Sequence, residues 1–362
     1  MTPAERAARA AAAFEVPGTP RVIGPLAGGL IHETWRVEAG GVEWVLQRLN
    51  RAVFPDIDGV MRNFAAVAAH LERRLVAARA VDRHRRALTL VPARGGGLWV
   101  EDADRGAWRC TMYIGGTTSR TEADSPAVAR EAGRAFGQFT RLLGDFDAPL
   151  AVTIPGFHHT ATRAAALERA IGRDVAGRVA SVTAEIEVLH EFRPLAHVLA
   201  PLVASGSVPT RPAHNDAKIA NLLFDDATGE AIAVVDLDTV MPGSALHDVG
   251  DLIRSTVGTA AEDEPELFNM TVRPEYFAAL VEGWFAGAGD ALTPMERELT
   301  LTAGRIMTYE QAVRFLTDHL EGDRYYPIAR PGHNLDRARA QIALLLDLTD
   351  RSEELEAIVA KA

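Results

Sequence analysis

The chain has 362 residues, of which 48% are hydrophobic and 24% charged, a composition typical of a soluble globular protein with room for two domains. Its formal net charge of −11 argues against binding to nucleic acid or to an anionic membrane. The single cysteine, Cys110, excludes an intrachain disulfide, the N-terminus lacks the apolar core of a signal peptide, and no apolar run reaches bilayer-spanning length. These features favour a reducing cytoplasm as the compartment.

The N-terminal part of the sequence predicts an antiparallel sheet with flanking helices. Ala-rich residues 3–14 favour a short helix, and apolar side chains at steps of three or four predict a second helix over residues 60–80. The strand-like stretches before that second helix are 22–26, 34–38 and 44–49. Gly28 and Gly29, between the first two strands, would let an oxyanion approach the backbone closely; an ordinary hairpin turn is the alternative.

Beyond residue 115 the pattern is mainly helical. The stretches with a helical apolar period begin near residue 126 and recur at 161–180, 182–206, 301–320 and 335–348. His158 and His159 lie in a loop between two of these stretches. Adjacent histidines without a third ligand nearby are more typical of a polar loop than of a zinc site.

One stretch of this helical part is followed by a predicted hairpin. Two short apolar strands flank a polar turn that contains a glycine, at 222–224 and 231–235. Folding these strands together would bring Asp216, Asn221 and Asp236 to one end of the hairpin. Carboxylate and amide oxygens are ligands that suit Mg²⁺. The alternative is that each of these residues merely caps a turn.

The order of these residues resembles the aminoglycoside-phosphotransferase and choline-kinase superfamily, a relative of the protein kinases. The strings that carry the resemblance are His-Asn-Asp-x-x-x-x-Asn at 214–221 and Val-Val-Asp-Leu-Asp at 234–238. Longer strings resemble its N-acetylhexosamine 1-kinase branch, at residues 45–50, 53–61, 235–243 and 314–323. The resemblance covers most of the chain.

The resemblance implies an α+β, protein-kinase-like bilobal fold. Residues 1–115 would form an N-terminal nucleotide-binding lobe with an antiparallel sheet, and residues 116–362 a larger, mainly helical lobe for catalysis and substrate binding. The implied reaction transfers the γ-phosphoryl group of ATP, with Mg²⁺, to a small-molecule sugar. The acceptor would be the anomeric hydroxyl of an N-acetylhexosamine, and the product its 1-phosphate.

The resemblance also assigns roles to residues. Asp216 would accept the proton of the attacking hydroxyl, and Asn221 and Asp236 would bind the metal. Lys218 would neutralise the phosphoryl group during transfer, with simple solvent exposure as the alternative. Asp238 would either support these metal ligands or bind a second metal. The residues expected to contact the acceptor are Asp216, Asp251 and Arg314.

The nucleotide site would draw on the N-terminal sheet. The glycine pair between the first two strands would cover the ATP phosphates. The third strand usually supplies a lysine for the phosphates, but the candidate positions here hold Gln47 and Arg48, which point to opposite faces of the strand. Backbone groups near Met112 and Ile114 would bind the purine.

Two other functions stay open at this stage. An aminoglycoside or a choline-type amino alcohol could replace the sugar as acceptor, and the acidic charge would suit such cations. A nucleotide-binding pseudokinase that scaffolds partners is the alternative from a different class, because the third strand lacks the usual lysine at Gln47. The set of Asp216, Asn221 and Asp236 argues against that reading.

Overall fold

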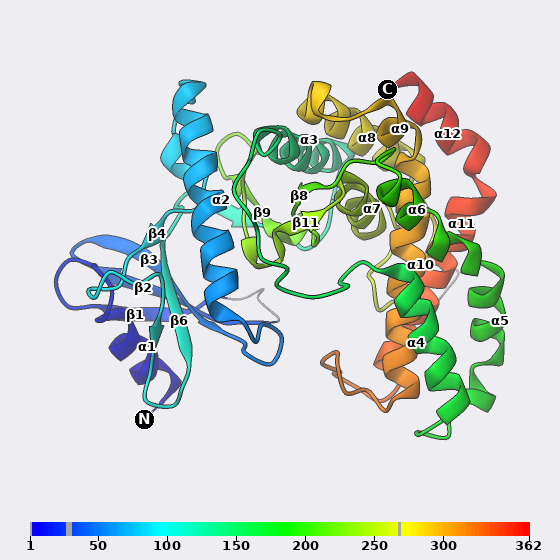
Figure 1. Cartoon of the computed structure of the whole chain (residues 1–362), viewed down its shortest axis with the longest axis horizontal. Helices are drawn as coiled ribbons and strands as arrows, with labels where there is room; N and C mark the ends of the chain where they lie inside the picture. Colours follow the sequence, from blue (N-terminus) through cyan, green and yellow to red (C-terminus); the bar gives the residue numbers. More distant parts are fainter. Residues whose placement is uncertain (1, 27–30, 267–268) are drawn as a thin grey trace. The chain divides into compact units, whose positions relative to one another are not determined.

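The computed structural model describes residues 2–26, 31–266 and 269–362, and its contacts divide the chain into two compact units (Figure 1). Unit 1 comprises Met1–Ser119, Leu142–Pro155 and Ala220–Pro242. Unit 2 comprises Arg120–Arg141, Gly156–Ile219 and Gly243–Ala362. The lobe boundary at residue 115 stays a prediction.

Unit 1 is built on an antiparallel sheet with the strand order β1-β2-β3-β6-β4, in which β5 also pairs with β6. The strands are β1 (Arg21–Pro25), β2 (Glu33–Ala39), β3 (Val42–Leu49), β4 (Leu90–Val91), β5 (Val100–Glu101) and β6 (Ala107–Met112). Gly40 and Gly41 turn the chain from β2 to β3 with φ of 63° and 78°, values that glycine adopts without a steric penalty. The register places Gln47 of β3 opposite Arg109 of β6.

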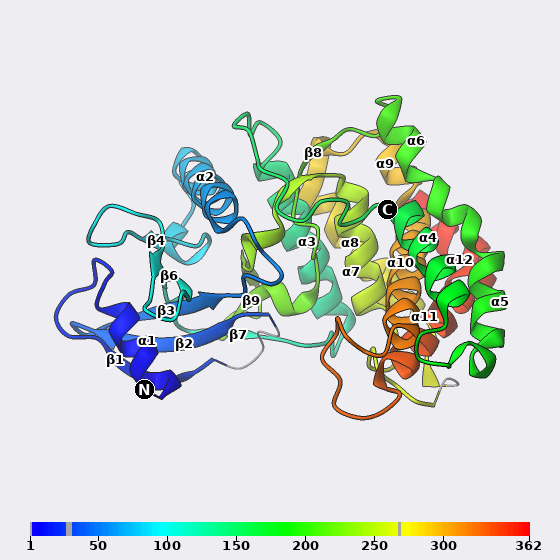
Figure 2. The same cartoon turned by 60° about the horizontal axis from the view of Figure 1, so that its bottom comes forward.

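Two helices cover opposite faces of this sheet (Figures 1 and 2). Helix α1 (Pro3–Ala11) begins with a capping box made by Thr2 and Glu5 and buries its alanines against the face that carries Trp108. Helix α2 (Ile57–Ala77) begins at Asp56, whose side chain accepts the Gly59 N–H. Its apolar stripe meets the other face of the sheet.

A second, small sheet of unit 1 carries the predicted hairpin. Its order is β10-β9-β7, with β7 at Thr117–Ser119, β9 at Leu222–Asp225 and β10 at Ala231–Val234. Asp225 closes the turn by accepting the N–H groups of Ala227 and Thr228. The hairpin predicted from the two apolar runs is therefore confirmed.

Unit 2 is mainly helical, as predicted. Its helices are α3 (Pro126–Leu142), α4 (Thr160–Arg173), α5 (Thr183–Glu191), α6 (Leu199–Ala204), α7 (Ala245–Thr256), α8 (Pro274–Ala288), α9 (Pro294–Glu298), α10 (Thr300–Leu320), α11 (His333–Asp350) and α12 (Ser352–Lys361). Helix α10 packs against α4, α7 and α11 and is buried over most of its circumference. The short strands β8 (Arg211–Ala213) and β11 (Met241–Gly243) complete the elements.

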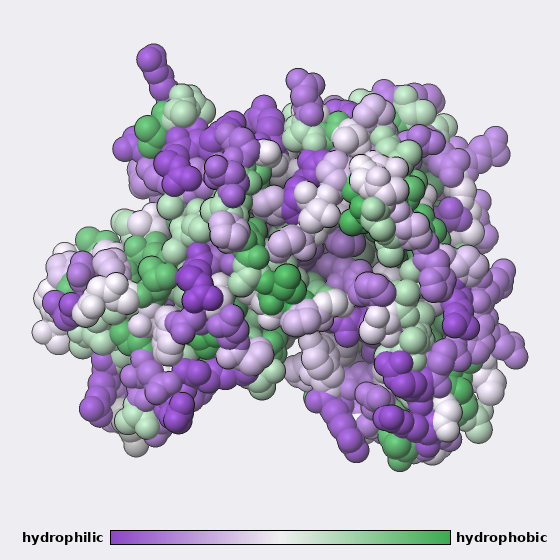
Figure 3. Space-filling model, viewed as in Figure 1, coloured by the Kyte–Doolittle hydropathy of each residue, from purple (hydrophilic) through white to green (hydrophobic). Residues whose placement is uncertain are grey.

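The face drawn in Figure 3 interleaves hydrophilic and hydrophobic residues. Within the described part of the chain, every helix is either too short or too polar to cross a bilayer.

Candidate active site

The hairpin of unit 1 brings two of the predicted metal ligands together. The Val235 N–H donates to the Asn221 carbonyl at 2.9 Å, so Asn221 and Asp236 lie at the same end of the hairpin. Asp236 takes a left-handed backbone conformation with φ of 60°. Asn221 is buried, with 5% of its surface exposed. An amide oxygen and a carboxylate at one strand end form a donor set that fits Mg²⁺.

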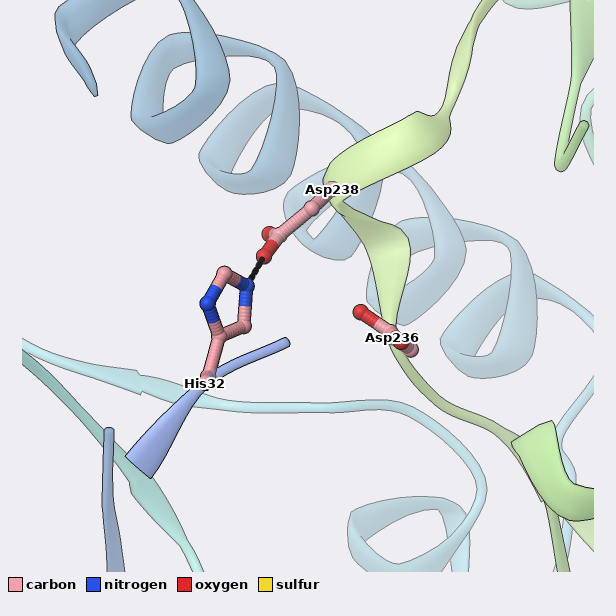
Figure 4. A group of neighbouring side chains, drawn as sticks. All are labelled: His32, Asp236 and Asp238. Atoms are coloured by element: carbon pink, nitrogen blue, oxygen red, sulfur yellow. Dashed lines mark hydrogen bonds and ion pairs between the residues drawn. The ribbon is translucent and has the colours of Figure 1, made fainter. Parts of the chain in front are cut away.

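Asp236 is also part of a cluster with His32 and Asp238, whose potential ligand atoms all lie within 4.8 Å of one another (Figure 4). The Asn50 N–H donates to His32 Nδ1 at 3.1 Å, which places the ring proton on Nε2. His32 Nε2 then donates to Asp238 Oδ2 at 2.6 Å. Neither ring nitrogen of His32 therefore has a lone pair left for a metal. In this arrangement His32 holds Asp238 rather than an ion.

Asp238 is 1% exposed and both of its carboxylate oxygens are occupied. His32 donates to Oδ2, and the Arg109 guanidinium forms an ion pair with Oδ1. Burial by itself would raise the pKa of Asp238, but Arg109 and the hydrogen bond from His32 outweigh it and hold that pKa well below its usual range. Of the two possibilities predicted for Asp238, these contacts favour support of Asp236 over binding of a second metal.

The two candidate cation positions on β3 have different surroundings. Arg48 pairs with Glu33 at 3.0 Å, on a partly exposed part of the sheet. Gln47 donates to Thr34 Oγ1 at 3.3 Å and accepts a hydrogen bond from Arg109 Nε at 2.9 Å. The buried cation on this face thus comes from Arg109 of β6. A charged residue inside a run of apolar ones was the sequence signal that could have identified it.

The predicted purine site falls on an apolar patch of unit 1. The N–H groups of Met112 and Tyr113 donate to the carbonyls of Thr89 and Glu43, so of these three residues the Ile114 N–H is the donor left for a purine nitrogen. Ile114 packs in one cluster with Ile232 and Ala233 of β10. Gly28 and Gly29, predicted to cover the phosphates, lie outside the described residues.

Asp216 belongs to unit 2 and lies in a loop whose backbone is hydrogen-bonded to a buried carboxylate. Asp248 of α7 accepts the His214 N–H at 2.9 Å and the Asn215 N–H at 2.7 Å. The pKa of Asp248 is raised by burial, which these hydrogen bonds only partly offset. Because Asn215 has a φ of 60°, the loop needs such anchors to keep its shape.

A second anchor of this loop is His158, which the sequence had suggested to be an ordinary loop residue. Its Nδ1 lies 2.7 Å from Glu310 Oε1, and its Nε2 lies 2.7 Å from the Asn215 carbonyl oxygen. A carboxylate and a carbonyl both accept, so both ring nitrogens must carry protons and His158 is an imidazolium. Burial would lower the pKa of His158, but Glu310 raises it above the ordinary value.

This ion pair predicts a pH-dependent stability. The contribution of His158 is present below an imidazole pKa of about 6.5 and is lost as the pH rises through its raised folded pKa. The pKa of Glu310 is lowered to about 2, against the effect of burial, by His158, so its contribution is lost only as the pH falls toward that value. His158→Gln should lower the free energy of unfolding by about 3 kcal/mol near pH 6. The loss should shrink at higher pH.

Urea unfolding from pH 5 to pH 9 would measure this difference between the variant and the wild type. His247, 5.0 Å from His158 between ring centres, stays neutral because burial and His158 lower its pKa to about 3. The contribution of His247 to stability is lost as the pH falls below about 6.5. The test is therefore the difference in unfolding free energy between the variant and the wild type at each pH, not the pH dependence of either protein alone. His197→Gln, at an exposed histidine of the same unit, is the control. A constant difference at all pH values would contradict the imidazolium.

The remaining predicted residues of unit 2 are mostly paired. Lys218 Nζ lies 2.9 Å from Asp216 Oδ2, so the lysine is bound to the predicted base. Asp251 is 5% exposed and pairs with Arg254 at 2.7 Å. Arg314 donates to Gln311 at 3.2 Å and lies over the rings of Phe157 and Tyr326. Burial would lower the pKa of Arg314, but Tyr326, Glu310 and Asp251 raise it above its usual value.

Solved structures share this architecture at low identity. A microcompartment-associated aminopropanol kinase matches with a TM-score of 0.59 and 17% identity over 98% of both chains. The amicoumacin kinase hAmiN, solved with AMP-PNP, Ca²⁺ and Ami, matches with a TM-score of 0.60 and 16% identity over 94% of this chain and 93% of its own. A choline/ethanolamine kinase family protein from Mesorhizobium loti matches with a TM-score of 0.51 and 19% identity over 99% of both chains.

An antiparallel sheet in unit 1 and helices in unit 2, shared with these kinases, define a protein-kinase-like fold. Residues 22–295 match the phosphotransferase enzyme family. The chain belongs to that family.

Proposed function

We propose that the protein is an ATP- and Mg²⁺-dependent kinase that phosphorylates the anomeric hydroxyl of an N-acetylhexosamine and releases the sugar 1-phosphate. The observation that carries the kinase assignment is the placement of Asn221 and Asp236 at one end of a hairpin. Both follow Asp216 in the sequence, and Asn221 follows it by five residues. This order of base, amide and carboxylate is the one that phosphoryl transfer uses in kinases. A single cysteine fits a reducing cytoplasm as the proposed compartment.

The proposed roles follow from the chemistry of the side chains. Asp216 would accept a hydrogen bond from the attacking hydroxyl, aim its oxygen at the γ-phosphorus and take its proton as the bond forms. Asn221 and Asp236 would hold Mg²⁺, which neutralises charge on the phosphates when it is bound. Lys218, bound to Asp216 at 2.9 Å, would add a positive charge beside the base. The patch around Ile114 would hold the purine.

The charges of unit 2 support a neutral acceptor. Three carboxylates of this unit are each paired with a cation: Asp216 with Lys218, Asp251 with Arg254 and Glu310 with His158. Arg314, four residues after Glu310 on α10, has only a neutral hydrogen-bond partner. Next to Arg314 an ammonium group would meet a like charge, whereas the hydroxyl and carbonyl oxygens of an acetylated sugar can accept from a guanidinium.

An amino-alcohol kinase is the second candidate. It is favoured by the names of two matching structures, an aminopropanol kinase and a choline/ethanolamine kinase family protein. Both are less than 20% identical to this chain, and their likeness supports the fold rather than the acceptor.

A panel assay separates these candidates. ADP release would be measured with Mg²⁺ and ATP over N-acetylhexosamines, aminoglycosides and amino alcohols, with excess EDTA as the control. We expect turnover with an N-acetylhexosamine, a ³¹P resonance coupled to the anomeric proton of the product, and no turnover with EDTA. Turnover restricted to amino alcohols would show that the acceptor is an amino alcohol and not a sugar. Nucleotide binding without any turnover would support a scaffold.

A further inference from the structure

Arg109 is a buried arginine that the proposed reaction does not use directly. It lies on β6 with 1% of its surface exposed, and elements of unit 1 hold its guanidinium. Gln47 of β3 accepts from Nε at 2.9 Å, Asp238 forms an ion pair with it, and the ring of Phe64 on α2 lies 4.7 Å away. A charge this deeply buried is costly unless such partners compensate it.

We propose that Arg109 is a positioning residue for the metal site, which fixes Asp236 in place through Asp238. The proposal rests on the proposed function, in that Asp236 is taken as a metal ligand. It assigns to β6 the buried cation that β3 does not supply.

The turn after Asp236 is held at several points, and Arg109 provides the charge among them. Arg109 and His32 occupy the two oxygens of Asp238, and Thr153 Oγ1 donates to the Asp238 carbonyl at 3.1 Å. Asp236, two residues earlier, has a φ of 60°, a conformation that costs an L-residue about 1 kcal/mol or more and persists only where its surroundings impose it. Without the Arg109 guanidinium, the buried charge of Asp238 would be less well compensated, and its carboxylate would be held less firmly in this position.

The same contacts explain why glutamine, not lysine, stands at position 47. Gln47 lies directly opposite Arg109 in the register of β3 and β6. Its side-chain oxygen accepts from Arg109 while its nitrogen donates to Thr34. A lysine there would place a second buried cation against the guanidinium and could accept no hydrogen bond from it. Gln47 and Arg109 thus form one hydrogen-bonded pair between β3 and β6.

The experiment measures metal binding rather than turnover. Mn²⁺ affinity would be determined by electron paramagnetic resonance with the full chain and AMP-PNP, below the melting temperature of each variant. Arg109→Met should weaken Mn²⁺ binding by roughly 10- to 100-fold, the effect of removing a group that orients a ligand. Arg109→Lys should recover part of the affinity, because it restores the charge but not the fork that reaches both Gln47 and Asp238.

Trp108→Phe is the matched control. Trp108 is the neighbouring residue on β6, fully buried on the opposite face of the sheet, where it donates to Asp102 at 2.7 Å. It should lower the melting temperature but leave Mn²⁺ affinity within about twofold of the wild type, because its side chain lies on the opposite face of the sheet from Arg109. If Arg109→Met binds Mn²⁺ as tightly as the wild type, Arg109 is only structural.

Gln47→Leu keeps the test decisive if Arg109→Met does not fold. It removes the brace of Arg109 while leaving the ion pair with Asp238, and it should weaken Mn²⁺ binding in the same direction but less. Unchanged affinity in Gln47→Leu would overturn the proposal. A wild type that binds Mn²⁺ and AMP-PNP but phosphorylates no sugar would remove the acceptor assignment alone, whereas a wild type that binds no Mn²⁺ would remove the metal role of Asp236 itself.

Discussion

Replacing Asp216 by asparagine is expected to lower kcat by about 10²-fold or more, the scale of a positioned general base. The asparagine keeps the size of the side chain and most of its hydrogen bonding, but it cannot take the proton of the attacking hydroxyl. Phosphoryl transfer through a loose transition state depends on aiming that hydroxyl in line. Affinity for Mg²⁺ and nucleotide should change little, since Asn221 and Asp236 remain. Steady-state kinetics and nucleotide titration would measure both.

The control for this variant is Asp290→Asn, which removes an exposed carboxylate of the same unit. It should retain wild-type kcat and KM. Wild-type turnover in Asp216→Asn would show that this loop is not the catalytic centre and would direct attention to the scaffold reading.

Replacing Asp236 by asparagine should damage binding as well as rate. The amide is a weaker ligand for a hard cation than the carboxylate, and a metal that neutralises phosphates supplies several kcal/mol of stabilisation. We expect kcat to fall by about 10²-fold or more and the affinity for Mg²⁺ and ATP to fall with it. Titration with Mn²⁺ in the presence of AMP-PNP, together with kcat measured over a range of Mg²⁺ concentrations, would test this.

Asp226→Asn is the corresponding control, because Asp226 is an exposed carboxylate in the turn of the same hairpin. A loss of rate in Asp236→Asn with unchanged metal affinity would contradict its assignment as a metal ligand. Such a result would reassign that role to Asp238 or to a residue of unit 2.

Local patterns in the sequence were enough to predict much of the fold. The two apolar runs on either side of the turn at 225–230 specify the β9–β10 hairpin, and a step of three or four specifies α2 and α10. These signals depend on neighbours a few residues apart. The placement of Asn221 beside Asp236 follows from the same hairpin, so it too could be predicted.

The supports of the site could not be predicted, since they depend on residues far apart in the chain. Arg109 and Asp238 are separated by 129 positions, and His158 and Glu310 by 152. A sequence shows a charged residue but not the buried partner that compensates it, and a surface arginine has the same letter as a buried one.

The acceptor is a harder inference for a different physical reason. The base and the metal ligands are shared by kinases with unrelated acceptors, so they specify a reaction rather than a substrate. The strings around 45–61 and 314–323 resemble the N-acetylhexosamine 1-kinase branch, whereas the family match is to phosphotransferases in general. The guanidinium of Arg314, which donates to Gln311, is the feature of unit 2 that bears on this choice.

Both predicted functional loops contain a residue in a left-handed conformation that is not glycine. Asn215, next to the proposed base, and Asp236 each have a φ of 60°. Glycine would adopt this geometry with less strain, so a laboratory selection for heat resistance alone could exchange the proposed metal ligand Asp236 for glycine. A selection for turnover would keep it. Thermostabilising this protein by consensus or by screening melting temperature should therefore hold position 236 fixed, because a gain in stability there would remove the carboxylate proposed to bind the metal.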